Sequence, residues 1–124
     1  MGRKFEKLLE PGRIGSIRTR NRMVKSGAAA RYWGSDENQI DDYSKNYYEA
    51  LARGGIGLLI VEGPLIEPEK GRMKGNYRLD DDKYIKGVAE LTGLIHKHGC
   101  PAFVQLNHNC NWQRQMAWHQ TNTD

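Results

Sequence analysis

The stretch Leu58-Leu59-Ile60-Val61-Glu62 decides the fold of this chain, because it is short, continuously apolar up to its last residue and flanked by glycines. Gly54-Gly55 stands before it and Gly63-Pro64 follows it. Such a run is typical of a strand that is buried on both faces of a parallel sheet. A second run, Ala102–Leu106, comes later in the chain and carries the polar Gln105 near its end. Together the two runs predict strands of a parallel α/β fold.

An amphipathic helix is predicted before each of these two strands. The first covers about residues 39–53, and Gly54 stands where a helix commonly ends. The second follows the N-cap candidates Asp80 and Asp81 and closes at Gly99. Both carry side chains at helical spacing, which predicts one inward face for each helix. These are Ile40, Tyr43, Tyr47 and Leu51 in the first helix, and Tyr84, Val88, Leu91, Ile95 and His98 in the second.

Two further elements are predicted before the first helix, and a loop between the helices. Arg13–Arg18 predicts a hairpin of two short strands that turn at Gly15-Ser16. Met23–Ser26 predicts a first buried strand, although Lys25 interrupts its apolar character. The polar stretch Pro64–Leu79 contains further proline and glycine residues and predicts a long loop over a site.

The carboxyl ends of the strands are the expected functional face. Parallel βα units place functional groups at those ends, and here the loops after the strands are long while the turns before them are short. Chemistry is therefore expected at Ser26–Ala29, at Glu62-Gly63 and at Gln105–His108.

Length and composition limit the class of protein. The chain has 124 residues, a net charge of +4 and a mean hydropathy of −0.77. Residues 1–124 suit one domain, but a (β/α)8 barrel needs about 250 residues. No apolar run approaches the roughly 20 residues that span a bilayer. The amino terminus lacks the apolar core of a secretory signal. We expect a cytoplasmic protein that binds no membrane.

The basic residues and the cysteines suggest no special partner. The arginines between positions 13 and 22 admit either a nucleic-acid patch or solvated hairpin side chains. No aromatic residue lies among them, which favours the second interpretation and predicts no nucleic-acid partner. Cys100 and Cys110 are expected to be free thiols in a reduced compartment.

Common nucleotide and metal motifs are missing from the sequence. There is no P-loop, and Gly12–Gly15 does not match the dinucleotide-binding fingerprint. His96 and His98 are two residues apart on a predicted helix and point in different directions. His108 and Cys110 do not make up the four-ligand set that a structural zinc ion requires. No metal site is predicted.

Two polar residues on the predicted strands each have two interpretations. Glu62 could act as a general base, or it could pair with a nearby Arg or Lys, and the ion pair is favoured. Gln105 needs hydrogen-bond partners, since an unpaired buried amide costs about 1–3 kcal/mol. A heterocycle with alternating donors and acceptors, such as the pyrimidine edge of a flavin, would satisfy the amide. A neighbouring backbone or side-chain group would satisfy it equally well.

Several motifs in order resemble one known family. The chain is similar to the opening of the old yellow enzyme family of FMN-dependent ene-reductases, which is related to NADH:flavin oxidoreductases and 2,4-dienoyl-CoA reductases. The similarity runs from about Phe5 to His108. It rests on Leu8–Pro11, Ile14-Gly15, Arg20–Val24, Tyr47–Glu49, Gly54–Glu62 and Phe103–His108.

The resemblance implies a fold and a set of cofactor-binding residues. The fold is α/β: the N-terminal portion of a (β/α)8 TIM barrel, with about three βα units and a hairpin, at about residues 12–19, that caps the barrel's bottom. FMN would lie at the carboxyl face. Gly27, Ala28 and Ala29 would line the flavin, Gly63 would approach it with its backbone, and Gln105 would bond its pyrimidine edge.

The resemblance also implies an activity for a complete enzyme. NAD(P)H would reduce FMN, and the reduced flavin would reduce an activated C=C bond of an enone or enoyl-CoA type. The flavin would be held non-covalently, because Ala29 carries no sulfur where some relatives have Cys. The family has His-Ala-Gly-Arg where this chain has His108–Asn111, which implies an altered loop.

The catalytic residues of the family lie downstream of the segment that this chain matches, as would any iron–sulfur cluster or FAD. We therefore expect a fragment that is inactive by itself and that associates as a homo-oligomer or with a complementing C-terminal chain. The alternatives are a non-catalytic partial barrel that pairs with such a chain, and an inactive truncated relic.

Overall fold

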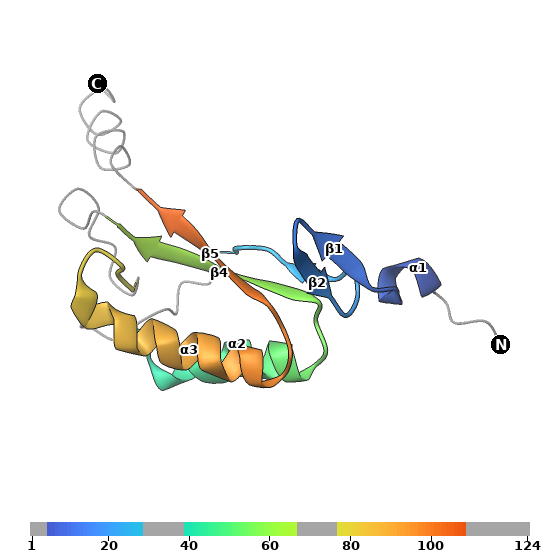
Figure 1. Ribbon diagram of the computed structural model, residues 1–124. Coiled ribbons are helices and arrows are strands. Elements are labelled where there is room, and N and C mark those ends of the chain that lie inside the picture. The colour runs from blue at the N-terminus through green and yellow to red at the C-terminus, as the bar shows by residue number, and fades with distance from the viewer. Residues whose placement is uncertain (1–4, 29–38, 67–76, 109–124) are drawn as a thin grey trace, which may run out of the picture.

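The computed structural model describes residues 5–28, 39–66 and 77–108 of the chain. These residues form a small hairpin and a parallel sheet with two helices packed on it (Figure 1). The elements in chain order are α1 (Glu6–Leu9), β1 (Gly12–Ile14), β2 (Ile17–Thr19), β3 (Val24–Lys25), α2 (Asp42–Arg53), β4 (Leu58–Leu65), η2 (Asp82–Tyr84), α3 (Ile85–Lys97) and β5 (Ala102–Asn107).

The sheet has the parallel arrangement that the sequence predicts. Its strand order is β3-β4-β5, with β4 in the centre, and both of its pairings are parallel. In register, Lys25 lies beside Leu59 and Glu62 lies beside Gln105. Figure 1 shows α2 and α3 on the same face of this sheet, and no helix within residues 5–28, 39–66 and 77–108 covers the other face. The described residues thus form a partial βαβαβ unit in which the three strands run in one direction.

The inward face of α2 differs from the predicted one. Tyr43 is 60% exposed and Tyr47 is 36% exposed, whereas Ser44, Tyr48 and Ala52 are buried. The difference arises because two polar groups on this face have partners inside the protein. The Ser44 hydroxyl donates to the N-cap residue Asp41 over 2.7 Å, and the Tyr48 hydroxyl donates to Glu62 Oε2 over 2.7 Å. A search for apolar periodicity alone misses a face built in this way.

The inward face of α3 agrees with the prediction. Leu91 and Ile95 are fully buried, and Tyr84, in the 3-10 turn η2 that leads into the helix, is 7% exposed. The Asp81 side chain caps this turn by accepting a hydrogen bond from the Lys83 amide over 3.0 Å. The apolar core joins the buried faces of α2 and α3 to Leu59, Val61, Ile40, Tyr77 and Cys100.

The strand β4 is longer than predicted. Pro64 and Leu65, which the sequence assigns to a loop, belong to the strand together with Gly63, with a register irregularity between Glu62 and Leu65. The extension forms because the chain returns beside it: the Leu65 amide donates to Tyr77 O over 3.0 Å, and the Leu79 amide donates to Leu65 O over 2.9 Å. The predicted loop is therefore shorter, and residues 67–76 lie outside the described ranges.

The predicted hairpin forms as an antiparallel pair with Gly12 opposite Thr19. It lies at the amino ends of the parallel strands (Figure 1). Arginines after the hairpin make contacts within the protein: Arg20 donates to His98 O, and Arg22 pairs with Glu10 at 3.1 Å. Arg20 and Arg22 thus have partners within the protein, which neither the nucleic-acid patch nor the solvated side chains considered from the sequence included.

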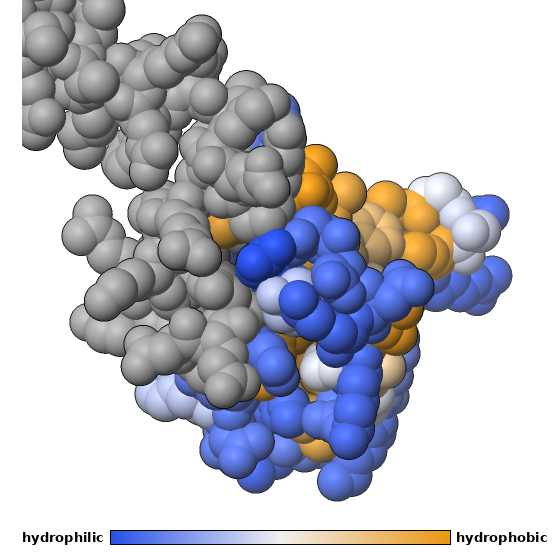
Figure 2. Space-filling model, turned by 90° about the vertical axis from the view of Figure 1, so that its left-hand side faces the viewer, coloured by the Kyte–Doolittle hydropathy of each residue, from blue (hydrophilic) through white to orange (hydrophobic). Residues whose placement is uncertain are grey.

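The strand β5 is not buried on both faces as its apolar sequence suggested. Phe103 is 36% exposed, Val104 is 37% exposed and Leu106 is 58% exposed, and on β3 Val24 is 47% exposed. In Figure 2 hydrophobic atoms gather on the upper side, while the lower, helical side is mostly hydrophilic. Only β4, which has a strand on either side, is buried along most of its length. None of the helices within residues 5–28, 39–66 and 77–108 is long and apolar enough to cross a bilayer.

We expect Tyr48→Phe to lower the free energy of unfolding by about 1.5–3 kcal/mol, because Glu62 Oε2 loses a buried donor. Urea denaturation at a fixed protein concentration measures this loss. The control Tyr43→Phe, on the exposed side of the same helix, should stay within about 0.5 kcal/mol of the wild type. Equal losses for the two variants would contradict the importance of the Tyr48–Glu62 bond.

We also expect the chain to associate in solution, because the sheet face that the described helices leave uncovered carries exposed apolar side chains. Val24 and Phe103 lie on this face, since their register partners Leu58 and Ile60 alternate with the core residues Leu59 and Val61. Sedimentation velocity should show dimers or larger species that dissociate when Val24 and Phe103 are both replaced by Lys. A wild-type chain that sediments as a single monomeric species would show that this face is covered in another way.

Candidate functional site

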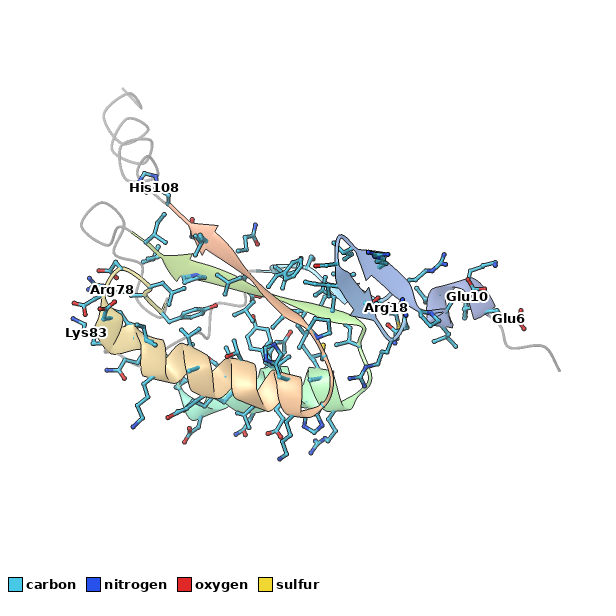
Figure 3. All side chains as sticks on the ribbon, in the orientation of Figure 1. Glu6, Glu10, Arg18, Arg78, Lys83 and His108 are labelled. Atoms are coloured by element: carbon cyan, nitrogen blue, oxygen red, sulfur yellow. The ribbon has the colours of Figure 1, made fainter. Side chains whose placement is uncertain are left out.

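The carboxyl ends of the three parallel strands lie together at one end of the molecule. Figure 3 shows His108 there, just after β5, with Arg78 and Lys83 at the same end near the start of α3. Glu6, Glu10 and Arg18 lie at the opposite end, around the hairpin. The predicted functional segments therefore meet at the carboxyl end, although Ala29 and the residues after His108 lie outside the described ranges.

Gly27 and Gln105 form a notch at this end, in which the amide of Gln105 occupies the space that a side chain at position 27 would need. A Cβ atom added to Gly27 would lie 1.9 Å from Gln105 Oε1 and 3.2 Å from Glu62 Cβ. Three strand ends thus approach each other so closely that only glycine fits between them without displacing the amide. We refer to Gly27, Glu62 and Gln105 as the strand-end notch.

The Gln105 side chain is open to a ligand. Gln105 is exposed on β5, and no hydrogen bond joins its amide to any part of the chain that the structure describes. Of the two interpretations of this residue, a structural amide would require a partner in the protein. The observed geometry favours an amide whose partner comes from outside the described residues.

The backbone at Gly63 is unusual in a way that suits a close approach. Gly63 has φ of 78°, in the left-handed region that favours glycine, and the irregularity of the β4–β5 pairing begins beside it. Ser26 and Ala28 at the end of β3 are both exposed. Residues with small side chains, or with none, therefore surround the strand-end notch.

Glu62 is buried within a network of polar side chains. Its carboxylate forms an ion pair with Lys25, and the Tyr48 hydroxyl donates to the same oxygen, Oε2. The Tyr77 hydroxyl donates to the Glu62 carbonyl oxygen. The network joins β3, α2, β4 and the segment that returns beside β4, and it confirms the interpretation of Glu62 as the partner of a lysine.

The two tyrosines of this network remain protonated donors. Burial raises the pKa of Tyr48 well above its ordinary value, and the hydrogen bond to Glu62 raises it further. Burial also raises the pKa of Tyr77, with an added contribution from the nearby Glu62 charge. Neither hydroxyl is placed to act as a base near neutral pH.

The two oxygens of the Glu62 carboxylate differ in their contacts among the described residues. Oε1 is buried and accepts no hydrogen bond from the residues in the described ranges. The sequence did not indicate the roles of Lys25, Tyr48 and Tyr77. The lysine that interrupts an otherwise apolar strand was the one available signal, since a buried ammonium group requires a partner.

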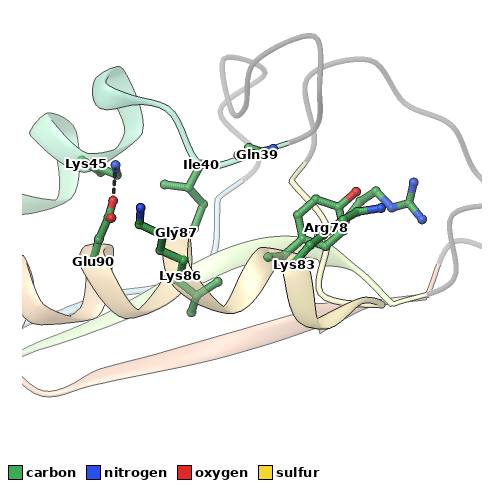
Figure 4. A pocket seen from close by; sticks show the side chains of 10 residues that line it. Gln39, Ile40, Lys45, Arg78, Lys83, Lys86, Gly87 and Glu90 are labelled. Atoms are coloured by element: carbon green, nitrogen blue, oxygen red, sulfur yellow. Dashed lines mark hydrogen bonds and ion pairs between the residues drawn. The ribbon is translucent and has the colours of Figure 1, made fainter.

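A cavity of about 210 Å³ lies elsewhere, between α2 and α3 (Figure 4). Cationic side chains contribute to its walls, but acidic neighbours neutralise most of them. Lys45 pairs with Glu90 at 2.7 Å, Arg78 pairs with Asp80, and Lys83 lies 3.4 Å from Asp81. With these charges already paired, the cavity is a weaker candidate for a ligand than the strand-end notch.

Comparison with known proteins identifies the family. The model of the NADH:flavin oxidoreductase / NADH oxidase family matches residues 7–120. An NADH oxidase of Thermoanaerobacter brockii is 36% identical over 105 residues, which cover 84% of this chain and 16% of that protein. The chain thus spans about a sixth of the length of this relative.

Solved structures show the same fold. An old yellow enzyme from Pichia sp. AKU4542 matches with a TM-score of 0.77 and 22% identity, over 92% of this chain and 30% of that one. A 2-naphthoyl-CoA reductase matches with a TM-score of 0.78 and 22% identity, over 85% and 16% of the two chains. The described elements are therefore the amino-terminal part of an old yellow enzyme TIM barrel. By its sequence and its fold, the chain belongs to the NADH:flavin oxidoreductase / NADH oxidase family.

Proposed function

We propose that the strand-end notch is part of the FMN site of an NAD(P)H-dependent oxidoreductase that reduces an activated C=C bond. The observation that carries this proposal is the position of Gln105, whose amide has no hydrogen-bond partner among the described residues and lies in the space that a side chain at Gly27 would need. The family is flavin-dependent, and the notch lies at the end of the strands where barrel enzymes bind their cofactors.

The residues present fit the pyrimidine edge of a flavin. That edge alternates hydrogen-bond acceptors with a donor, and a Gln amide can donate and accept at the same time. Gly27 and Ala28, together with Ala29, would line the flavin with little bulk. Gly63 would let the backbone approach the ring closely.

FMN, when bound, supplies the capacity to carry a hydride from NAD(P)H to the β-carbon of an activated alkene. The residues of this chain orient the cofactor rather than react. Gln105 would fix the position of the ring edge, and the lack of a side chain at Gly27 leaves room for the Gln105 amide. Groups that bind the substrate and donate a proton would come from other units of the barrel, so the substrate class follows from the family and not from the notch.

We expect Gln105→Leu to weaken FMN binding by about 1–3 kcal/mol, because polar atoms of the pyrimidine edge would lose their partner. Titration of FMN followed by quenching of its fluorescence measures the dissociation constant. Gln39→Leu makes the same substitution beside the cavity between the helices, away from the notch, and should leave the affinity unchanged.

Two results of this titration would contradict the proposal. Unchanged affinity in Gln105→Leu would show that this amide does not contact the flavin. Failure of the wild-type protein to bind FMN at all would show that the notch serves another ligand.

We also expect the flavin to be held without a covalent bond. Ala29 carries no sulfur, and Cys100 is buried just before β5, at the amino end of that strand, where burial raises the pKa of its thiol. Acid precipitation of the flavin-loaded protein should therefore release the flavin into the supernatant. Yellow colour that stays with the pellet would refute this expectation.

A further inference from the structure

The ion pair of Lys25 and Glu62 is buried, which is unusual for two charged side chains. The side chain of Lys25 is 13% exposed and that of Glu62 is 6% exposed. Removing two charges from water costs several kcal/mol per ion, and well-packed apolar residues in their place are often as stable. The stability of the fold alone therefore does not account for this pair.

Several groups in the described part of the chain face Glu62. Lys25 approaches from β3 and Tyr48 from α2, and both contact Oε2, while Tyr77 bonds the backbone oxygen. Tyr47 lies near enough for the Glu62 charge to help burial raise its pKa. The Lys25 ammonium is 5.2 Å from the centroid of the Tyr48 ring and 5.9 Å from that of Tyr47. Among the described groups around Glu62, Lys25 is the one positive charge.

Glu62, one member of this pair, is also a residue of the strand-end notch. The Cβ of Glu62 lies 3.2 Å from the position of a Cβ on Gly27, and Glu62 is the register partner of Gln105. A change in the charge or position of Glu62 would therefore affect the surroundings of both Gly27 and Gln105. The electron-rich edge of a flavin, placed there, would be repelled by an unpaired carboxylate.

We propose that Lys25 is a positioning residue that acts through Glu62, which it holds in place and neutralises so that the strand-end notch accepts the electron-rich edge of the flavin. This inference rests on the proposed function, because it concerns the same ligand. Nothing in the proposed roles of Gly27, Gly63 and Gln105 requires a lysine at position 25.

The test replaces the two charges separately and together and measures the FMN affinity of each variant at neutral pH. In Lys25→Met, Glu62 loses its counter-ion, and its unpaired carboxylate would face the electron-rich edge of the flavin. FMN affinity should be at least tenfold lower than that of the wild type.

The double variant Lys25→Met/Glu62→Gln is the decisive rescue. It has no charge to neutralise, so its FMN affinity should be restored to that of the wild type. Lys45→Met is the matched control, since it breaks the pair with Glu90 that lies between the helices and not at the notch. It should bind FMN as the wild type does.

Urea denaturation without FMN checks the charge itself. Lys25→Met should be less stable than the double variant, because the single variant alone leaves a buried carboxylate without its counter-ion.

The outcomes separate the two proposals. If the wild type binds FMN and Lys25→Met binds it equally well, or if the double variant does not regain affinity, the inference about Lys25 fails and the proposed function stands. If Lys25→Met loses stability but not affinity, the pair is structural and the inference also fails. If the wild type does not bind FMN, the proposed function fails and the inference fails with it.

Discussion

The carboxylate of Glu62 is the constraint on which the carboxyl end of the sheet depends. A buried charge must be paired and hydrogen-bonded, and the partners of Glu62 come from different parts of the chain. Lys25 comes from the neighbouring strand, and Tyr48 comes from the helix that covers the sheet. Tyr77, which bonds the Glu62 backbone, comes from the segment that returns beside β4. One residue thereby joins four segments at the end where parallel strands carry their functional groups.

At the carboxyl end of the sheet, a buried and hydrogen-bonded set of side chains lies beside an exposed side chain. Glu62 and its tyrosine donors are buried, whereas Gln105, its register partner on β5, is exposed and lacks a partner among the described residues. Gly27 lies against both residues and leaves room between them by carrying no side chain. A binding site needs a backbone held by buried contacts, and the Glu62 network supplies such contacts on the strand next to Gln105.

The sequence predicted the order of the elements well, because glycines and aspartates mark their ends. Leu58–Glu62 was recognisable as a central strand, and the family resemblance placed it in a barrel. The buried face of α2 was not predictable from apolar spacing, since Ser44 and Tyr48 are buried through polar contacts. The pairing of Lys25 with Glu62 joins distant positions, so the sequence could suggest a lysine partner for Glu62 but not which one.

The central claim is that the ends of β3, β4 and β5 meet around a single flavin edge. Nuclear magnetic resonance of the 15N-labelled protein during addition of FMN tests this most directly, with the side-chain amide of Gln105 assigned through Gln105→Leu. The account predicts that the Gln105 side-chain signals and the backbone amides of Gly27 and Gly63 shift together at the same FMN concentration. Binding that leaves these signals in place and shifts residues around Lys45 and Glu90 instead would contradict it.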